Sequence, residues 1–278
     1  MKNENRQAYL QHISSTYDER SGEHDSSKWH RKTALRLVKD MPPDIGDSVL
    51  DVATGTGTIA FKSAILVGSG GKVVGVDISK GMLAEANKKL SASGLDNLEF
   101  VLADAEHLEF PDNSFDRIYC ASAFFCILEP LKTLRHWNDL LKPGGALCFH
   151  ALPETSYFWV SIARSVLAEC GYQYRLNMPT ASAEKSQQLL TAAGFSKIDI
   201  QEEKSGYYVP FDDAIKSWLT EDGFTPGQYP HPLANVPPDI LAQCQREYEE
   251  RIKALNTDEG VWNDISMYYI YARKHSGT

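Results

Sequence analysis

The chain has 278 residues and a formal net charge of −9, with 42% hydrophobic and 23% charged residues. That length suits one large α/β domain with an added lid, and the composition is ordinary for a globular protein. An acidic surface repels nucleic-acid backbones and anionic membranes, so we expect a small-molecule partner and no nucleic acid.

The first forty residues are polar and indicate a helical arm. An apolar stripe at helical spacing follows Trp29, and the pair Pro42-Pro43 ends the second helix of the arm. Between its two helices, the polar segment from Tyr17 to Ser27 is expected to be a loop. We interpret the arm as a cover over one face of the core, and Tyr17 as a residue that could close over a ligand.

From Ser48 onward, apolar strands alternate with helices of about 10–15 residues, which predicts a parallel sheet with right-handed crossovers. The apolar runs are nearly continuous, as in strands that are covered on both faces. Ser79 suits a helix N-cap, and Gly94 suits the position after a helix. The predicted strands are 48–53, 72–77, 98–102, 116–121 and 146–152, and the predicted helices are 58–67, 80–93, 131–141, 157–170 and 183–193.

After Pro153 the alternation weakens. A strand or long hairpin arm is predicted over 197–209, and a strong strand over 266–274 closes the chain. Between them lies a Pro- and Gly-rich stretch with a charged helix over 239–255, which is typical of a lid beside a binding cleft. The predicted parts are an N-terminal helical arm (1–40), a core (41–210 and 265–278) and a lid insertion (211–264).

The five cysteines form no C-x-x-C pair and no zinc pattern, so we expect no metal site. Reduced thiols in apolar runs are typical of a cytoplasmic protein. The segment MKNENRQAYL lacks the apolar core of a signal peptide, and no apolar run approaches the length of a membrane span. The sequence leaves the oligomeric state open, a homodimer included.

The stretch from Val49 to Ala60, VLDVATGTGTIA, is the strongest candidate ligand site. A buried strand runs into a glycine turn and then a helix, which lets a ligand approach the backbone and meet free N–H groups. Gly55, Gly57 and Ala60 satisfy G-x-G-x-x-G/A, and Asp77 lies twenty residues after Gly57. This fits a dinucleotide fingerprint, so an NAD(P)-dependent oxidoreductase is one alternative.

Three further features favour a different ligand. Asp51 precedes the turn, where it would repel a pyrophosphate and attract a cationic group. Asp104 follows the third strand, where a carboxylate can accept a hydrogen bond from the exocyclic amine of adenine. The segment Lys142-Pro143-Gly144-Gly145 precedes the fifth strand.

The segments VLDVATGTG, VVGVDIS, ADAEHLEF, PDNSFD and LLKPGGALCF, in this order, resemble the class I S-adenosylmethionine-dependent methyltransferases. The resemblance covers about residues 45–152 and is strongest to the branch of the ubiquinone/menaquinone C-methyltransferases and many small-molecule methyltransferases. It implies a doubly wound, seven-stranded, Rossmann-like sheet whose last strand is antiparallel, roofed by the helical arm and the helical lid insertion. The implied cofactor is S-adenosylmethionine, and the product is S-adenosylhomocysteine.

The resemblance also implies a cofactor site at the strand ends. Asp51 would lie near the cofactor's amino group, Asp77 would accept both ribose hydroxyls, and Asp104 would accept the adenine amine. Taken singly, Asp77 could merely cap the next helix and Asp104 could merely hold a turn. The implied cofactor-binding residues are Tyr17, Asp51, Ala53, Gly55, Gly57, Asp77, Ile78, Met82, Asp104, Ala105 and Ser122.

Two departures from the family bear on the methyl acceptor. Many small-molecule members carry a polar pair after the fourth strand, whereas this chain has Phe125 and Cys126 there. The insertion 211–264 also differs from the quinone enzymes and favours a pocket for another compound, although quinone C-methylation stays an alternative. Candidate substrate-binding residues are Phe125, Tyr157, Phe158, Tyr208 and Trp218, which favour a small apolar or aromatic, natural-product-type acceptor.

The sequence leaves the catalytic base open. Methyl transfer is an in-line displacement that depends mainly on positioning and on the exclusion of water. The candidate bases are His150 on the fifth strand, His231 in YPHPL and Glu154 in the loop after the fifth strand. Each of them also suits a structural or surface role, and a carbon or amine nucleophile need use none of them. A non-enzymatic sensor that only binds the cofactor is a further alternative.

Overall fold

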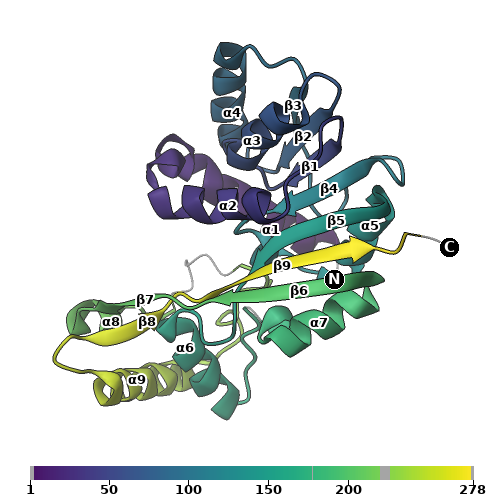
Figure 1. Cartoon of the computed structure of the whole chain (residues 1–278). Coiled ribbons are helices and arrows are strands. Elements are labelled where there is room, and N and C mark those ends of the chain that lie inside the picture. The colour runs from purple at the N-terminus through teal and green to yellow at the C-terminus, as the bar shows by residue number, and fades with distance from the viewer. Residues whose placement is uncertain (1–2, 177, 220–225, 277–278) are drawn as a thin grey trace.

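The computed structural model describes residues 3–176, 178–219 and 226–276. Within these residues, a central seven-stranded sheet has the order β3-β2-β1-β4-β5-β9-β6 (Figure 1). β1 to β5 pair in parallel, and β9 runs antiparallel to both β5 and β6. The predicted doubly wound sheet with an antiparallel last strand is therefore confirmed. The strands are β1 (Ser48–Val52), β2 (Lys72–Asp77), β3 (Leu98–Leu102), β4 (Phe115–Cys120), β5 (Leu141–Ala151), β6 (Phe195–Glu203) and β9 (Met267–Lys274).

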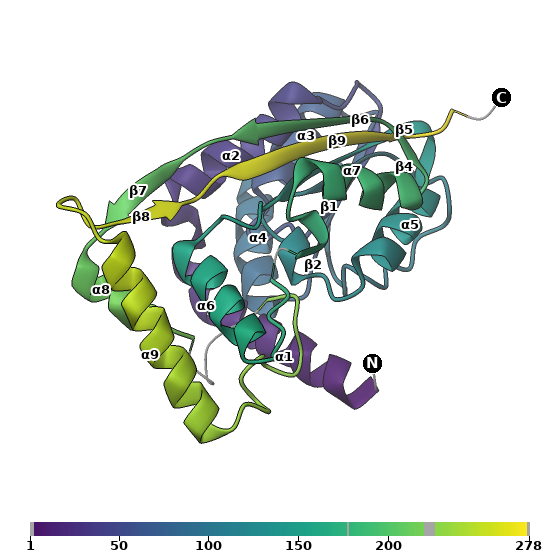
Figure 2. The same ribbon diagram turned by 90° about the horizontal axis from the view of Figure 1, so that it is seen from below.

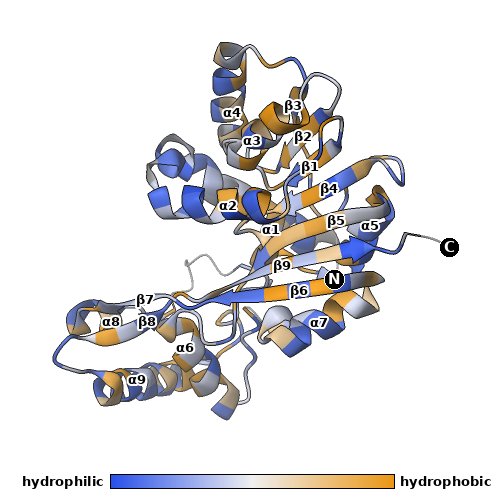
Figure 3. Cartoon of the chain, in the orientation of Figure 1, coloured by the Kyte–Doolittle hydropathy of each residue, from blue (hydrophilic) through white to orange (hydrophobic). Residues whose placement is uncertain are grey.

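Helices cover both faces of this sheet (Figures 1 and 2). On one face, Leu37 of α2 and Ile59 of α3 pack into a buried cluster with β1 and β2. On the other face, Trp137 of α5 and Leu190 of α7 pack against β4 and β5. Figure 3 shows the hydrophobic residues that run through the strands between these layers. The helices are α2 (Lys28–Asp40), α3 (Thr58–Val67), α4 (Lys80–Ser93), α5 (Pro130–Leu140) and α7 (Ala183–Ala192).

Local signals account for most element ends. The Ser79 hydroxyl accepts the Met82 N–H and caps α4, and Gly94 follows that helix in the left-handed conformation, as predicted. β5 is the exception, because it begins at Leu141 and includes the predicted turn before Ala146. Leu141 pairs with Phe115 of β4, so pairing with β4 extends β5 beyond its apolar run. The Arg273 side chain of β9 also donates to the Gly144 carbonyl at 3.0 Å.

The N-terminal arm is more helical than predicted. It consists of α1 (Asn3–Arg20), a 3-10 helix η1 (Ser21–Ser26) and α2. The predicted loop that begins at Tyr17 is wrong, because α1 continues to Arg20 and η1 follows at once. Asp18 Oδ1 accepts the Gly81 N–H at 2.7 Å, and Ser14 Oγ donates to the Ile78 carbonyl at 3.1 Å. These tertiary bonds hold α1 against the start of α4.

A second small cluster lies at one end of the long strands β6 and β9 (Figure 2). Leu167, Cys244 and Tyr248 are buried within it, apart from the core of the main sheet. The predicted strand or long hairpin arm over 197–209 is present as two strands, because the chain leaves the main sheet after β6 and continues as β7. The Ile265 N–H donates to the Ser205 carbonyl at 2.9 Å and keeps the ribbon paired across this break. The cluster contains α6 (Phe158–Glu169), β7 (Gly206–Val209), α8 (Phe211–Lys216), α9 (Pro238–Leu255) and β8 (Val261–Asp264).

The predicted lid insertion contains α8, α9 and β8, while its residues 220–225 lie outside the described part of the chain. In the part that is described, no helix has both the length and the apolar character needed to cross a bilayer.

Candidate active site

A cavity of about 330 Å³ opens at the C-terminal ends of β1, β2 and β4, where open α/β sheets bind their ligands. Its volume lies in the range of small-molecule sites. The arm forms one wall, and the loops after the strands form the others. The predicted cofactor residues that line this cavity are Tyr17, Asp51, Ala53, Gly55, Asp77, Ile78, Met82, Asp104, Ala105 and Ser122.

The glycine turn after β1 brings its backbone to the cavity. Gly55 and Gly57 have φ of 55° and 90°, in the left-handed region that glycine adopts at little cost. A Cβ on Gly57 would lie 2.8 Å from the rings of Phe61 and Phe100, so this glycine is needed for packing behind the turn. Gly57 is not part of the cavity wall, in contrast to the expectation from the sequence.

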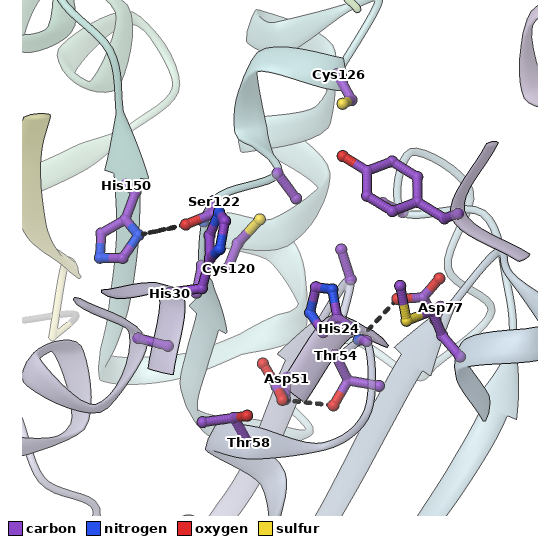
Figure 4. Close-up of a pocket in the computed structure, with 18 of the residues that line it drawn as sticks. His24, His30, Asp51, Thr54, Thr58, Asp77, Cys120, Ser122, Cys126 and His150 are labelled. Carbon is purple, nitrogen blue, oxygen red and sulfur yellow. Dashed lines mark hydrogen bonds between the residues drawn. The ribbon is translucent and has the colours of Figure 1, made fainter. Parts of the chain in front are cut away.

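Asp77 at the end of β2 joins the glycine turn to the start of α4 (Figure 4). Its Oδ2 accepts the Gly55 N–H at 2.8 Å, and its Oδ1 accepts the Ser79 N–H at 2.9 Å. Burial raises the pKa of Asp77, and these hydrogen bonds oppose the rise. Because the carboxylate also lines the cavity, it can hold the turn and contact a ligand at the same time.

Asp51 places a second carboxylate beneath the turn. Its Oδ2 accepts the Thr54 hydroxyl at 2.5 Å and the Ala60 N–H at 3.1 Å. Burial raises the pKa of Asp51 to about 7, against the effect of these two donors. A cation bound nearby would favour the ionised form, because it offsets the cost of burying the charge.

Asp104 is held by the arm. Arg6 of α1 forms an ion pair with Asp104, and it donates to Glu106 Oε1 at 3.1 Å. Burial by itself would raise the pKa of Asp104, but the Glu106 N–H and the Arg6 guanidinium stabilise the anion and lower the pKa overall. Asp104 is thus an anion in the cavity wall, held by Arg6 of the arm.

His150 supports the loop after β4. Its Nδ1 accepts the Ser122 N–H at 3.2 Å, and its ring meets the Tyr269 ring edge-on at 4.8 Å. His150 is 2% exposed, and burial lowers its pKa to about 3. Ser122 has a positive φ of 52°, so the hydrogen bond from its backbone helps to hold an uncommon conformation. His150 therefore lines the cavity as a neutral side chain.

The other two candidate bases lie elsewhere. Glu154 is exposed, and its side chain is not part of the cavity wall. The Nδ1 atom of His231 accepts the Leu233 N–H at 3.3 Å, in a loop that also does not line this cavity. The structure therefore brings His150 to the predicted cofactor residues, and it does not bring Glu154 or His231 there.

Only some of the predicted substrate-binding aromatic residues lie in the cavity wall. Phe125 and Tyr157 line the cavity. Phe158 is buried in the cluster around α6 and α9, and Trp218 packs against Tyr248 with 5.1 Å between ring centroids. Tyr208 is exposed on β7. The last three do not line the cavity, because they pack or point elsewhere.

Several residues of the arm reach the site without having been predicted, and Arg6, His24 and His30 are among those with polar contacts there. Arg6 binds Asp104, and both His24 and His30 line the cavity. The His24 ring lies over the glycine turn, 3.2 Å from where a Cβ on Gly55 would be. Their sequence neighbourhood is polar and has no spacing that marks a site, so only the folded arm reveals them.

An open, mostly parallel sheet with a glycine turn flanked by Asp51 and Asp77 is typical of Rossmann-like proteins that bind nucleotide-containing cofactors. A family model described as "Methyltransferase domain" matches residues 43–194, more than half of the chain. The chain belongs to this family, the S-adenosylmethionine-dependent methyltransferases. An NAD(P)-dependent oxidoreductase has no support among the relatives.

Named relatives agree with the family. The ubiquinone/menaquinone biosynthesis C-methyltransferase of Francisella philomiragia is 46% identical over 103 residues, which are 37% of this chain and 41% of that enzyme. The chain thus matches about two fifths of the length of that relative. The demethylmenaquinone methyltransferase of Clavibacter sepedonicus is 30% identical over 81% of this chain and 86% of that enzyme. The YcgJ protein of Bacillus subtilis shares the fold, with a TM-score of 0.58 and 21% identity over 88% of this chain and 99% of that one.

The residues present fit S-adenosylmethionine. The ligand carries a cationic sulfur and a ribose, and the cavity wall has Asp51 and Asp77 as buried acceptors. A Cβ on Gly55 would enter the space between the turn and His24, so the glycine leaves room for a ligand close to the backbone. S-adenosylmethionine is the cofactor of this family and of this chain.

Proposed function

We propose that the chain transfers the methyl group of S-adenosylmethionine to a small acceptor with an apolar or aromatic body. The observation that carries this proposal is the composition of the cavity wall beyond Ser122. Phe125, Leu152, Tyr157 and Met267 line the cavity, and they belong to one hydrophobic cluster. An apolar wall next to the reacting end of the cofactor site favours an acceptor that gains from burial.

In the proposed reaction, the cofactor supplies the reactive methyl group and the chain supplies the binding site. S-adenosylmethionine supplies an electrophilic methyl group, so the residues need only bind, orient and exclude water. Asp77 and the glycine turn would hold the ribose side, and Asp51 would face the cationic side. Ser122, supported by His150, would border the acceptor. The aromatic walls Phe125 and Tyr157 suit both an aromatic acceptor and a nearby cation.

The arm and the lid would complete the acceptor site. We assign the arm to residues 1–40, the core to 41–210 with 265–278, and the lid to 211–264. Tyr9 of the arm supports this assignment, because its hydroxyl donates to the Cys126 carbonyl at 2.7 Å and accepts the Gly227 N–H at 2.6 Å. The arm, the loop after β4 and the chain between α8 and α9 thus meet at one tyrosine. We place this activity in the cytoplasm, on small molecules rather than nucleic acids.

A quinone acceptor is the second candidate, because the relatives of Francisella and Clavibacter are named as quinone-pathway methyltransferases. A quinone ring would suit the same aromatic wall. The two candidates differ in the atom that is methylated, which is carbon in the quinone reaction and is left open for other acceptors.

The test is a product search by mass spectrometry. Purified protein with methyl-labelled S-adenosylmethionine is incubated with a panel of phenols, hydroxyquinones, demethylated quinones and polar amines. The expected result is a labelled product that has gained one CH₂ from an aromatic or quinone member, and fragmentation identifies the methylated atom. Methylation of polar amines alone would overturn the proposed acceptor class.

A further inference from the structure

His30 lies where the arm meets the reacting end of the cavity. It belongs to the first turn of α2, is exposed, and lines the same cavity as Ser122 and His150 (Figure 4). It is close enough to His150 that its charge would lower the pKa of His150. His30 therefore combines exposure with a place in the cavity wall near Ser122.

The N-cap of α2 orients the His30 ring. Ser27 Oγ accepts the His30 backbone N–H at 3.2 Å, and it lies 2.7 Å from His30 Nδ1. A hydroxyl oxygen that already serves as an acceptor can also accept the Nδ1–H. The Nε2 atom then keeps its lone pair, and no group in the described part of the chain bonds to it.

The charges around His30 favour a neutral ring near pH 7. Partial burial of the ring, and then the nearby His24 of η1, lower the pKa of His30. The His24 and His30 rings are stacked with centroids 6.3 Å apart, and Trp29 meets His30 edge-on at 5.0 Å. His150 of β5 faces the same space as a neutral group.

His150 cannot take the proton of an acceptor as readily. It is 2% exposed, and its Nδ1 is engaged by the Ser122 N–H. Burial disfavours a charged ring at His150, whereas His30 is exposed. The Nε2 of His150 also has no hydrogen-bond partner in the described part of the chain, but it is buried, so His30 is the one of the two that joins such a nitrogen with contact to solvent.

We infer that His30 is the general base of the reaction, and this inference rests on the proposed function. An acceptor with an acidic O–H or C–H gives its proton to His30 Nε2. The acceptor atom forms a bond to the methyl carbon, the carbon–sulfur bond breaks, and its electron pair stays on sulfur. The proton then passes from His30 to water. The acceptor class is accordingly phenols, enols and hydroxyquinones, whose X–H bond must be broken during transfer.

The kinetic test compares His30→Gln with His275→Gln, an exposed histidine near the end of β9. With the acceptor found in the product search, His30→Gln should lose about 100- to 10,000-fold in kcat. The fall in kcat at acidic pH, which is expected for the wild type, should be absent in His30→Gln. Acceptors that are already ionised at the assay pH should lose much less. The calorimetric Kd for S-adenosylmethionine should stay within about twofold, because the substitution keeps the cofactor contacts.

A second measurement needs no acceptor. In the ¹⁵N spectrum of the free protein, His30 should show protonated Nδ1 and unprotonated Nε2, and this pattern should be lost in Ser27→Ala. The inference is overturned if His30 carries its proton on Nε2, or if His30→Gln keeps the kcat and pH profile of the wild type. If the wild type methylates only polar amines, the proposed acceptor class fails, and the tautomer then decides whether His30 is poised as a base.

Discussion

Replacing Asp77 by alanine should weaken the binding of S-adenosylmethionine by about 30- to 1000-fold. The buried carboxylate lines the cavity and can accept both ribose hydroxyls. Two charge-assisted hydrogen bonds lost correspond to a net cost of about 2–4 kcal/mol, which converts to that range of Kd. The Gly55 and Ser79 N–H groups would also lose their acceptor, so the free energy of unfolding should fall by about 1–3 kcal/mol.

Titration calorimetry above pH 7.5 measures the Kd while Asp51 stays ionised. Asp77→Asn keeps the side-chain shape and one acceptor oxygen, and it should fall between alanine and the wild type. Asp112→Ala, an exposed carboxylate between β3 and β4, is the matched control and should bind normally. Circular dichroism shows which variants are folded. A folded Asp77→Ala protein with the Kd of the wild type would refute the assignment of this carboxylate to the ribose.

Three further predictions concern the surroundings of the cofactor. The pKa of Asp51 is raised to about 7, so Asp51 loses its negative charge, and with it the attraction for a cation, on acidification. The affinity for S-adenosylmethionine, measured by calorimetry, should therefore drop by up to about tenfold from pH 8 to pH 6. If Asp51→Asn shows a drop of the same size, this explanation is contradicted. Gly57→Ala should lower the free energy of unfolding by about 1–3 kcal/mol in urea titrations. The φ of Gly57 is 90°, and the Cβ of an alanine there would clash with Phe61 and Phe100. Unchanged stability would show that the turn can shift. Glu106→Ala should lower the free energy of unfolding in urea by about 3 kcal/mol, because Arg6 and the Leu128 and Glu129 N–H groups lose a buried acceptor. A loss below about 1 kcal/mol would mean that water replaces the carboxylate.

The parallel core was predictable because its signals are local. Each of its strands is a short apolar run, and Ser79 and Gly94 mark the ends of α4 by their own chemistry. The carboxylates Asp51 and Asp77, which line the cavity, could be singled out from their positions in β1 and at the end of β2. Long, strongly patterned elements carry this information in neighbouring residues, so no tertiary contact is needed to find them.

The arm and the lid were harder to predict because long-range contacts decide their structure. α1 is mostly polar and buries Tyr9 and Ile13, and it is held by Arg6, Ser14 and Asp18, which bind partners some sixty to a hundred residues away. The helical continuation past Tyr17 and the roles of His24 and His30 depend on that docking. The break between β6 and β7 depends on pairing with β8 and β9, which lie more than fifty residues later in the chain.

The position of β9 has a consequence for how the protein folds. β9 follows every other strand of the sheet in the sequence, yet it lies between β5 and β6 and pairs with both along most of its length. Until β9 is synthesised, β5 has an open edge and β6 has no neighbour in the sheet, and such unpaired edges favour aggregation. The same strand continues from β8, so the small cluster around α9 is also completed late. A chain interrupted before Met267 would lack the contacts that join both parts, so the seven-stranded sheet is complete only after β9 has been synthesised.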